Sequence, residues 1–345
     1  SMSHVLARIV SSTFGGPKIP TLHNLANAIA YQAHRSMSTI KATPAQVKEL
    51  REKTGSPMMD CKNALEASAG DVEKAIEWLR KKGMASAAKK ESRKSADGLV
   101  VTLLDNSGLR GSVVELNSET DFVARNPIFQ KLAVDLCKLH LTCHGQDFAG
   151  FKAAKLASGP KSTGAVSVED AVKEMVATVG ENCQLRRAAG LSVTKGGVFR
   201  YIHNALGDDM GKLGVLVALE STTTKTDALK ALGTELAMHV AAGNPLVATV
   251  EEIPAAAAEK EKAIFMEQAA ATGKAANLLE KMVQGRIKKW HDEVVLLEQE
   301  CLVGEPKRKV KKILADAQAT LGAPVTLKGF LRFKCGDAAA AAAAN

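Results

Sequence analysis

Apolar residues recur every three or four positions across residues 43–83, and this spacing predicts three short helices. Thr43 has the side chain of a helix cap and begins the first helix, while Asp71 caps the third. Gly83 is expected to end the third helix. The sequence therefore predicts a small three-helix module, followed by a linker over residues 84–97 that has no apolar stripe.

Beyond this linker the pattern becomes two strands and a helix, and it occurs twice. The copies consist of residues 98–105, 111–117 and a helix from Asn126, and of residues 198–205, 214–219 and a helix with Leu229, Leu232, Leu236 and His239. A helix near 168–179 and a strand over 184–193 lie between them. We therefore predict an α+β fold whose core has two related halves, residues 98–196 and residues 197–253 with 320–335.

Residues 254–310 interrupt the second half with a helical pattern. Apolar side chains spaced by four, four and three positions form one stripe, namely Leu279, Val283, Ile287 and Trp290. Gly273 separates this stripe from an earlier helical segment, so we expect an antiparallel helical hairpin. Residues 327–333 are expected to form a closing strand, and residues 336–345 an alanine-rich disordered tail.

Charge is unevenly distributed along the chain, which has 345 residues and a net charge of +9. Residues 1–48 contain no acidic residue, and Arg8, Lys18 and Arg35 lie there among many Ser and Ala residues. A basic, serine-rich and acid-free N-terminus is typical of an organelle transit peptide. We therefore expect residues 1–38 to direct the protein to the mitochondrial matrix; the alternative is an ordinary disordered tail.

Composition argues against several classes of protein. Apolar residues make up 46% and charged residues 24%, as in a folded globular protein. No run of about 18 uncharged apolar residues is present, so no membrane-spanning helix is expected. Aromatic residues are only 4%, which does not favour base stacking on single-stranded nucleic acid. Six cysteines without a C-x-x-C pair indicate a reducing compartment and no disulfide framework.

The sequence contains no motif of a conventional enzyme. Residues 207–213 resemble a phosphate-binding loop, but they are one residue too short and place Asp208 and Asp209 where phosphates need backbone N–H groups. We interpret them as a hairpin turn. No G-x-G-x-x-G, H-E-x-x-H or G-x-S-x-G motif occurs. We therefore expect no catalytic residue, no cofactor and no nucleotide site in this chain.

Two other clusters have simple interpretations. Cys137, His140, Cys143 and His144 carry donor atoms that zinc accepts, but all four lie at one helix end. This arrangement favours a thiol-containing helix over a metal site. The basic run over residues 307–312 is surrounded by acidic residues, so a solvated surface is favoured over a phosphate-binding site.

Residues 118–126 (Ser-Glu-Thr-Asp-Phe-Val-Ala-Arg-Asn) leave a strand and precede a helix. Most Phe side chains in proteins are buried, so residue types alone favour a loop in which Asp121 bonds local backbone and Phe122 fills the core. The alternative places Asp121 and Phe122 at a protruding tip. There an aromatic ring beside an acid can wedge into a partner protein.

Several blocks of the sequence are similar, in order, to one known family. They are residues 47–55, 58–65, 120–124, 180–182, 186–187, 239–242, 280–286 and 329–333. On these blocks the chain resembles the elongation factor Ts family, in an organellar form, over residues 44–335. The resemblance implies a ubiquitin-associated-like N-terminal module, a two-part core and a helical hairpin insertion. It also implies a guanine-nucleotide exchange factor for elongation factor Tu.

The resemblance further implies which residues bind that partner. Asp121 and Phe122 match the wedge that the family places near the magnesium ion of the bound nucleotide. The remaining contacts match Lys48, Arg51, Met58 and Met59 in the module, and Leu213, Gly214 and His239 in the second half of the core. In this mechanism the wedge disturbs the groups that support magnesium, and GDP then leaves. No membrane, specific nucleic acid or metal is expected as a partner.

Two other functions stay open at the level of the sequence. The chain could be an adaptor whose three-helix module binds ubiquitin or another small domain, without nucleotide release. It could also be a basic RNA-binding protein, although only +6 of the charge remains beyond residue 40 and aromatic residues are few. The Gly- and Lys-rich residues 142–166 lie outside the family pattern, and the sequence assigns them no role.

Overall fold

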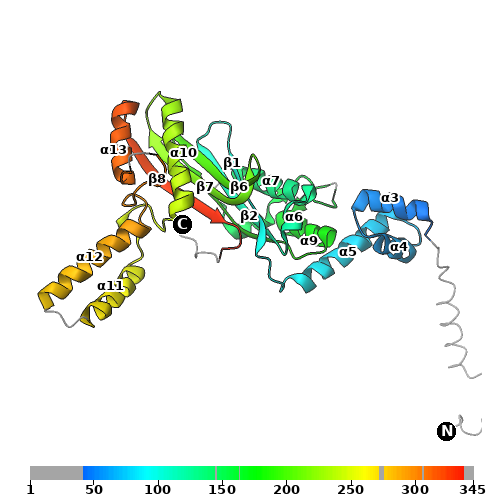
Figure 1. Cartoon of the computed structure of the whole chain (residues 1–345). Coiled ribbons are helices and arrows are strands. Elements are labelled where there is room, and N and C mark those ends of the chain that lie inside the picture. The colour runs from blue at the N-terminus through cyan, green and yellow to red at the C-terminus, as the bar shows by residue number, and fades with distance from the viewer. Residues whose placement is uncertain (1–41, 144–145, 163, 272–275, 305–306, 338–345) are drawn as a thin grey trace, which may run out of the picture.

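The protein is an elongated α+β molecule, with a helical unit at each end of a central sheet (Figure 1). Its computed structural model describes residues 42–143, 146–162, 164–271, 276–304 and 307–337. The predicted transit peptide (residues 1–38), His144 and Gly273 lie outside these residues, as does most of the predicted tail. The prediction of an α+β class is confirmed.

Three helices form the N-terminal module: α3 (Pro44–Thr54), α4 (Met58–Ala67) and α5 (Val72–Lys90). Thr43 caps α3 as predicted. Its Oγ1 accepts a hydrogen bond from the Gln46 N–H at 3.3 Å, and the Gln46 side chain accepts one from the Thr43 N–H at 3.0 Å. The small core of the module consists of Val47, Leu50, Cys61, Ala64, Leu65, Ala75 and Leu79.

Helix α5 does not end at Gly83, so the predicted linker over residues 84–97 is wrong in its first half. The helix continues through Ala87, which is buried in the core of the first half. Gly83 lies where α5 crosses α9 (Val168–Val179), and a Cβ atom there would be 2.7 Å from the Cβ of Ala177. Glycine permits this close approach, although it costs a helix about 1 kcal/mol relative to Ala.

Six strands form one antiparallel sheet: β1 (Asp97–Leu104), β2 (Arg110–Ser118), β5 (Gln184–Ser192), β6 (Gly197–Gly207), β7 (Met210–Ser221) and β8 (Val325–Lys334). Strand β2 lies between β1 and β5, and β7 lies between β6 and β8. Each half is therefore a hairpin that gains a third strand beside its second strand. The halves join where Val100 and Val101 of β1 pair with Gly211 and Met210 of β7.

Successive side chains of a strand point to opposite faces of the sheet, so each strand contributes to two different hydrophobic cores. Leu99 and Val101 of β1 pack beneath α7 (Pro127–Thr142), whereas Val100 packs against the second half. In the same way, Val215 of β7 packs beneath α10 (Thr226–Gly243), whereas Leu216 packs against the first half. The first half also contains α6 (Asp121–Ala124), α8 (Phe148–Ala153), β3 (Lys155–Leu156) and β4 (Val166–Ser167). The predicted repeat of hairpin and helix is thus present in both halves.

Helices α11 (Ala255–Ala270) and α12 (Ala276–Val294) form the predicted antiparallel hairpin, which projects from the core (Figure 1). A single 3-10 turn (Val250–Glu252) precedes it. The hairpin ends earlier than predicted, because Leu296 and Cys301 are buried in the core of the second half. Helix α13 (Val310–Leu321), which was not predicted, covers the same core.

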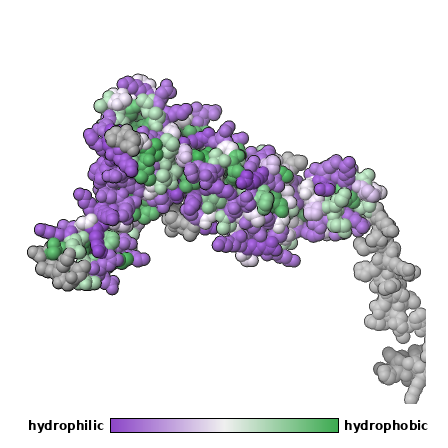
Figure 2. Space-filling model, in the orientation of Figure 1, coloured by the Kyte–Doolittle hydropathy of each residue, from purple (hydrophilic) through white to green (hydrophobic). Residues whose placement is uncertain are grey.

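The face of the molecule in Figure 2 is mostly hydrophilic, with small separate hydrophobic areas on the sheet, the module and the end of the hairpin. None of the helices in the described residues is long and apolar enough to cross a membrane. A candidate binding site on this surface therefore consists of individual exposed side chains, not of one large hydrophobic patch.

Candidate functional site

The most exposed large apolar side chain of the described residues stands between β2 and α7. Residues 120–124, here called the tip, form a short turn of helix (α6), in which Phe122 is 81% exposed. The next two side chains face the opposite way, since Val123 and Ala124 are buried in the core of the first half. The prediction from residue types alone, that Phe122 fills the core, is wrong. The core at this point is filled by its neighbours, and Phe122 is left outside.

Hydrogen bonds hold the base of the tip in place. The Thr120 N–H and hydroxyl both donate to the Glu181 carboxylate, at 3.0 and 2.7 Å. The Ser118 hydroxyl donates to the Thr120 carbonyl at 2.8 Å, and the Asn182 N–H donates to the Glu119 carboxylate at 2.6 Å. The tip is therefore held at its base on two chain segments that are far apart in sequence.

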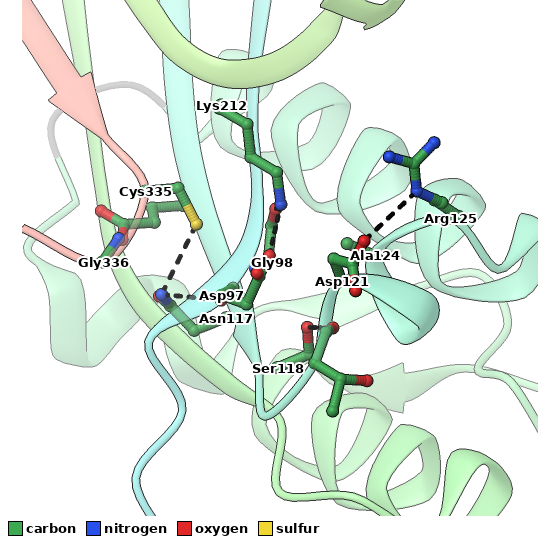
Figure 3. A network of polar contacts seen from close by, with 12 residues as sticks. Asp97, Gly98, Asn117, Ser118, Asp121, Ala124, Arg125, Lys212, Cys335 and Gly336 are labelled. Carbon is green, nitrogen blue, oxygen red and sulfur yellow. Dashed lines mark hydrogen bonds and ion pairs between the residues drawn. The ribbon is translucent and has the colours of Figure 1, made fainter. Parts of the chain in front are cut away.

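The carboxylate of Asp121 lies beside Phe122 and remains accessible. Its side chain is 47% exposed, and it forms an ion pair with Arg125, where Nε and Oδ2 are 3.6 Å apart (Figure 3). Exposed pairs of this kind contribute little to stability. Asp121 is thus free to exchange Arg125 for polar groups of a partner.

Behind the tip, a polar network joins the two halves of the core (Figure 3). Lys212 of β7 bonds the Asp97 carboxylate and donates to the Gly98 carbonyl at 2.9 Å. Burial alone would raise the pKa of Asp97, but hydrogen bonds from Lys212 and the Gly98 N–H outweigh it and hold that pKa below its usual value. Burial raises the pKa of the neighbouring Cys335 thiol to about 12, so this thiol is neutral. The network supports the sheet beneath the tip.

The four predicted contact residues of the module lie on its outside. Lys48 and Arg51 are exposed on α3, and Met58 and Met59 begin α4 with 53% and 63% of their surfaces exposed. These four residues are called the module surface below. Methionine side chains are flexible and polarizable, which suits them to docking against a partner. Lys48 pairs with Glu52 at 4.0 Å, and its side chain is largely exposed, so its charge is available.

The predicted contact residues of the second half lie beneath the surface. Leu213 is 7% exposed and belongs to the core under α10, and a Cβ atom on Gly214 would lie 2.7 Å from Val100 and Thr102 side chains. His239 is 1% exposed. Their role in partner binding stays a prediction, and in this structure these side chains can act only through the residues that cover them.

Hydrogen bonds fix the tautomer of His239. Both N–H groups of the Gln299 amide donate to the carbonyls of Gly243 and Glu293, so its oxygen accepts from His239 Nε2 at 3.0 Å. The Leu302 N–H donates to His239 Nδ1 at 3.1 Å. Burial lowers the pKa of His239, which agrees with a neutral ring. The side chain of Leu302 is 55% exposed, so His239 supports an exposed residue that the sequence did not single out.

The other clusters considered in the sequence have structural roles here. The turn predicted over residues 207–213 joins β6 to β7 but is shorter, because β6 ends at Gly207 and β7 begins at Met210. The Cys137 thiol is buried against β1 and β2, and no group of three metal-binding side chains exists among the described residues. Residues of the basic run pair with acids of this chain: Arg308 and Lys312 with Asp316, Lys309 with Asp292 and Glu298, and Lys311 with Glu298.

The sequence of this chain matches one family over most of its length. A family model described as "Elongation factor TS" matches residues 119–337. Proteins named elongation factor Ts from Sinorhizobium fredii and Rhizobium meliloti are 50% and 49% identical to it over 295 residues, or 86% of this chain and 93% of each relative. The chain belongs to the elongation factor Ts family. A third relative, elongation factor Ts of Bartonella bacilliformis, is 48% identical over the same shares.

As a member of this family, the protein is a factor of translation elongation. The family match begins at Glu119, so it contains the tip, the second half of the core and the hairpin. The module precedes the family match, although the relatives align with 86% of the chain. These relatives are bacterial proteins, and the mitochondrial location of this chain stays a prediction.

Proposed function

We propose that this chain is a guanine-nucleotide exchange factor, which binds elongation factor Tu with GDP and accelerates GDP release. The observation that carries the proposal is the 81% exposure of Phe122 on a tip whose base is fixed by Thr120 and Glu181. A rigid exposed aromatic side chain is suited to inserting into a partner, because little conformational freedom is lost on binding. The known role of the elongation factor Ts family supports the same function.

In the proposed mechanism, Phe122 enters between side chains of the partner while Asp121 competes for the groups that support magnesium. Loss of the magnesium ion leaves the diphosphate charge of GDP poorly compensated. GDP then dissociates faster, and GTP can enter the empty site. This coupling is reciprocal. A factor that lowers the affinity of the GTPase for GDP by a given ratio has its own affinity for the GTPase lowered by the same ratio when GDP is bound.

Affinity in this proposal comes from surfaces away from the nucleotide. The module surface contacts the G domain of the partner, and the second half of the core holds it from another side. No group of this chain forms or breaks a covalent bond in the exchange. We place this activity in the mitochondrial matrix, on the basis of the acid-free residues 1–48.

The test is the release of a fluorescent GDP analogue from the cognate Tu-type GTPase, followed by stopped flow. The double variant Asp121→Ala, Phe122→Ala should lower the rate of release by about 30-fold or more, the effect of losing a binding hot spot. Met266→Ala removes another exposed apolar side chain, 55% exposed on the hairpin, and serves as the matched control. Wild-type release by the double variant would reject the wedge.

The same experiment separates exchange from the adaptor function. An adaptor that acts through the module surface would bind the GTPase without changing the rate of GDP release. Binding of the unaltered protein with no acceleration at any concentration would therefore support the adaptor.

A further inference from the structure

One lysine bonds the module and the core at the same time. Lys161 lies between β3 and β4, and its Nζ donates to the Ser56 hydroxyl at 3.0 Å and to the Ala177 carbonyl at 3.2 Å. Ser56 belongs to the module, between α3 and α4, and is 1% exposed. Ala177 belongs to α9 of the core. The ammonium group therefore occupies the junction between the two parts of the chain.

The segment that carries Lys161 is bound to α9 by a buried carboxylate. Glu174 is 3% exposed and accepts hydrogen bonds from the Lys161 N–H, at 3.1 Å, and from the Ser162 hydroxyl. Glu174 also forms an ion pair with Arg80 of α5, where Arg80 Nε and Glu174 Oε1 are 3.8 Å apart. A Cβ atom on Gly159 would lie 2.3 Å from Glu174 Oε2, so the backbone passes close to this carboxylate. A buried charge with these partners is costly to leave unpaired.

Helix α5 provides the second connection between module and core. Its Leu79 is buried in the module and its Ala87 in the first half of the core, so one continuous helix enters both. At its end, Lys90 Nζ donates to the Gly180 carbonyl at 2.8 Å. The module therefore meets the core along α5, and Lys161 adds a contact to Ser56, which lies outside α5. A contact that does not lie on α5 resists rotation of the module about that helix.

The C-terminal end of α9, which carries Ala177, leads directly to the tip. Glu181 and Asn182 follow this helix and bind Thr120 and Glu119 at the base of the tip. The Asn182 side chain also donates to the Arg93 carbonyl, at 2.7 Å, just beyond α5. The last turn of α9 and the two residues after Gly180 thus connect the Lys161 contact with the tip.

We propose that Lys161 is a positioning residue, which fixes the orientation of the module surface relative to the tip so that both meet one partner together. This role in exchange rests on the proposed function, whereas the fixed orientation is a property of the chain alone. When two surfaces of one protein are held at the separation that the partner requires, the second contact forms with little further loss of translational and rotational entropy. The affinity for the partner is therefore higher than either surface gives alone. Lys161 and Ser162, which lie within the residues 142–166 that the sequence left without a role, thereby gain one.

The first test measures the orientation directly in the full chain. Spin labels at Glu49→Cys in the module and Lys138→Cys on α7, both exposed sites, report one distance distribution by pulsed EPR. The partly exposed Cys143 and Cys335 are replaced by Ser. The variant Lys161→Met keeps the side-chain length and removes the ammonium, and it should broaden the distribution.

Lys155→Met is the matched control, because Lys155 is exposed on the same segment, and it should leave the distribution narrow. An unchanged distribution in Lys161→Met would overturn the proposal. If Lys161→Met fails to fold, as judged by circular dichroism, Ser56→Ala removes only the module end of the contact and decides the same question.

The second test measures exchange with the same variants. For Lys161→Met, the factor concentration that gives half-maximal GDP release should rise about tenfold, while the maximal rate at saturation stays within about twofold. A lower maximal rate with unchanged half-saturation would contradict positioning, as would a broad distribution with unchanged exchange. If the unaltered protein does not accelerate release at all, the proposed function fails, and the distance measurement still decides whether Lys161 fixes the module.

Discussion

Two neighbouring residues of the tip differ in their surroundings, since Phe122 faces solvent and Val123 faces the core. Phe122→Ala should change the free energy of unfolding by no more than about 0.5 kcal/mol, because its side chain contributes little buried area. Val123→Ala should cost about 2 kcal/mol through lost burial. Urea unfolding followed by circular dichroism gives both values. A large loss of stability in Phe122→Ala would mean that the ring packs against the molecule and cannot serve as a free wedge.

The neutral ring of His239 makes part of the stability dependent on pH. Its pKa in the folded protein lies below the usual value of about 6.5, so the unfolded chain binds a proton that the folded protein does not. Stability should therefore fall as pH decreases below about 6.5. Urea midpoints at pH 7.5 and pH 5.5 measure this loss, which should be smaller in His239→Gln.

The matched control for this prediction is His203→Gln, because His203 is exposed on β6. That variant should keep the pH dependence of the unaltered protein. An equal change in both variants would contradict a special role for His239.

At the scale of elements, two glycines in helices should respond oppositely to the same change. A Cβ atom on Gly83 would meet Ala177 at 2.7 Å, whereas one on Gly285 of α12 would have no heavy atom within 4 Å. Gly83→Ala should therefore destabilise the module by about 1–3 kcal/mol, and Gly285→Ala should stabilise the hairpin by up to about 1 kcal/mol.

The two Trp residues of the chain allow each effect to be read separately. Trp78 lies on α5 and Trp290 on α12. Gly83→Ala is made in a Trp290→Phe background, and its urea unfolding is followed by Trp78 fluorescence. Gly285→Ala is made in a Trp78→Phe background, and its urea unfolding is followed by Trp290 fluorescence. Stabilisation by Gly83→Ala would show that α5 and α9 do not approach as closely as described.

Local sequence signals predicted the elements that local interactions determine. Thr43 and Asp71 cap α3 and α5 as expected, and the alternating strands and the helix of each half were recognisable from their periodicity. The end of α5 was predicted wrongly because a glycine can either end a helix or allow close packing within one. Gly83 has the second role, since it lies against Ala177 of α9.

Helix α13 was missed because its local signals are weak. Lys309 occupies the cap position without a side-chain capping bond, and Lys311 and Lys312 follow in the first turn. The basic run suggested a solvated surface. In the structure these lysines form the outer side of the helix, paired with Glu298 and Asp316, while Ile313 and Leu314 are buried beneath them.

The same distinction applies to the candidate site. Family resemblance singled out Asp121 and Phe122, which solvent reaches, but it could not reveal that His239 is buried and bonded to the Leu302 backbone. Nor could it reveal that Lys161 bonds the module, since its partners Ser56 and Ala177 are distant in sequence. Contacts of this kind depend on the folded chain and leave no local pattern.

For the whole molecule, exposed functional surfaces occur on parts that have separate cores. The module core, the two outer cores beneath the helices and the core between the two halves of the sheet share no buried residue. The hairpin contributes no residue to any of the four among the described residues. It should therefore be removable without unfolding the rest.

Replacing residues 257–290 by a six-residue Gly-Ser loop, which spans about 13 Å, tests this separation. The replacement keeps Asp292, whose carboxylate bonds Lys309 at 2.7 Å, and the Glu293 carbonyl that Gln299 binds. Hydrogen exchange in β7 should remain as slow as in the unaltered protein, because the core beneath α10 is intact.

Leu314→Ala provides the comparison, since it removes a buried side chain from that core and should accelerate exchange in β7 through a loss of about 2–5 kcal/mol. Fast exchange in β7 after removal of the hairpin would mean that the hairpin stabilises the second half. In that case the apolar stripe of α12 would have to contact the core during folding, because in the folded structure its buried Val283 belongs to none of the four cores.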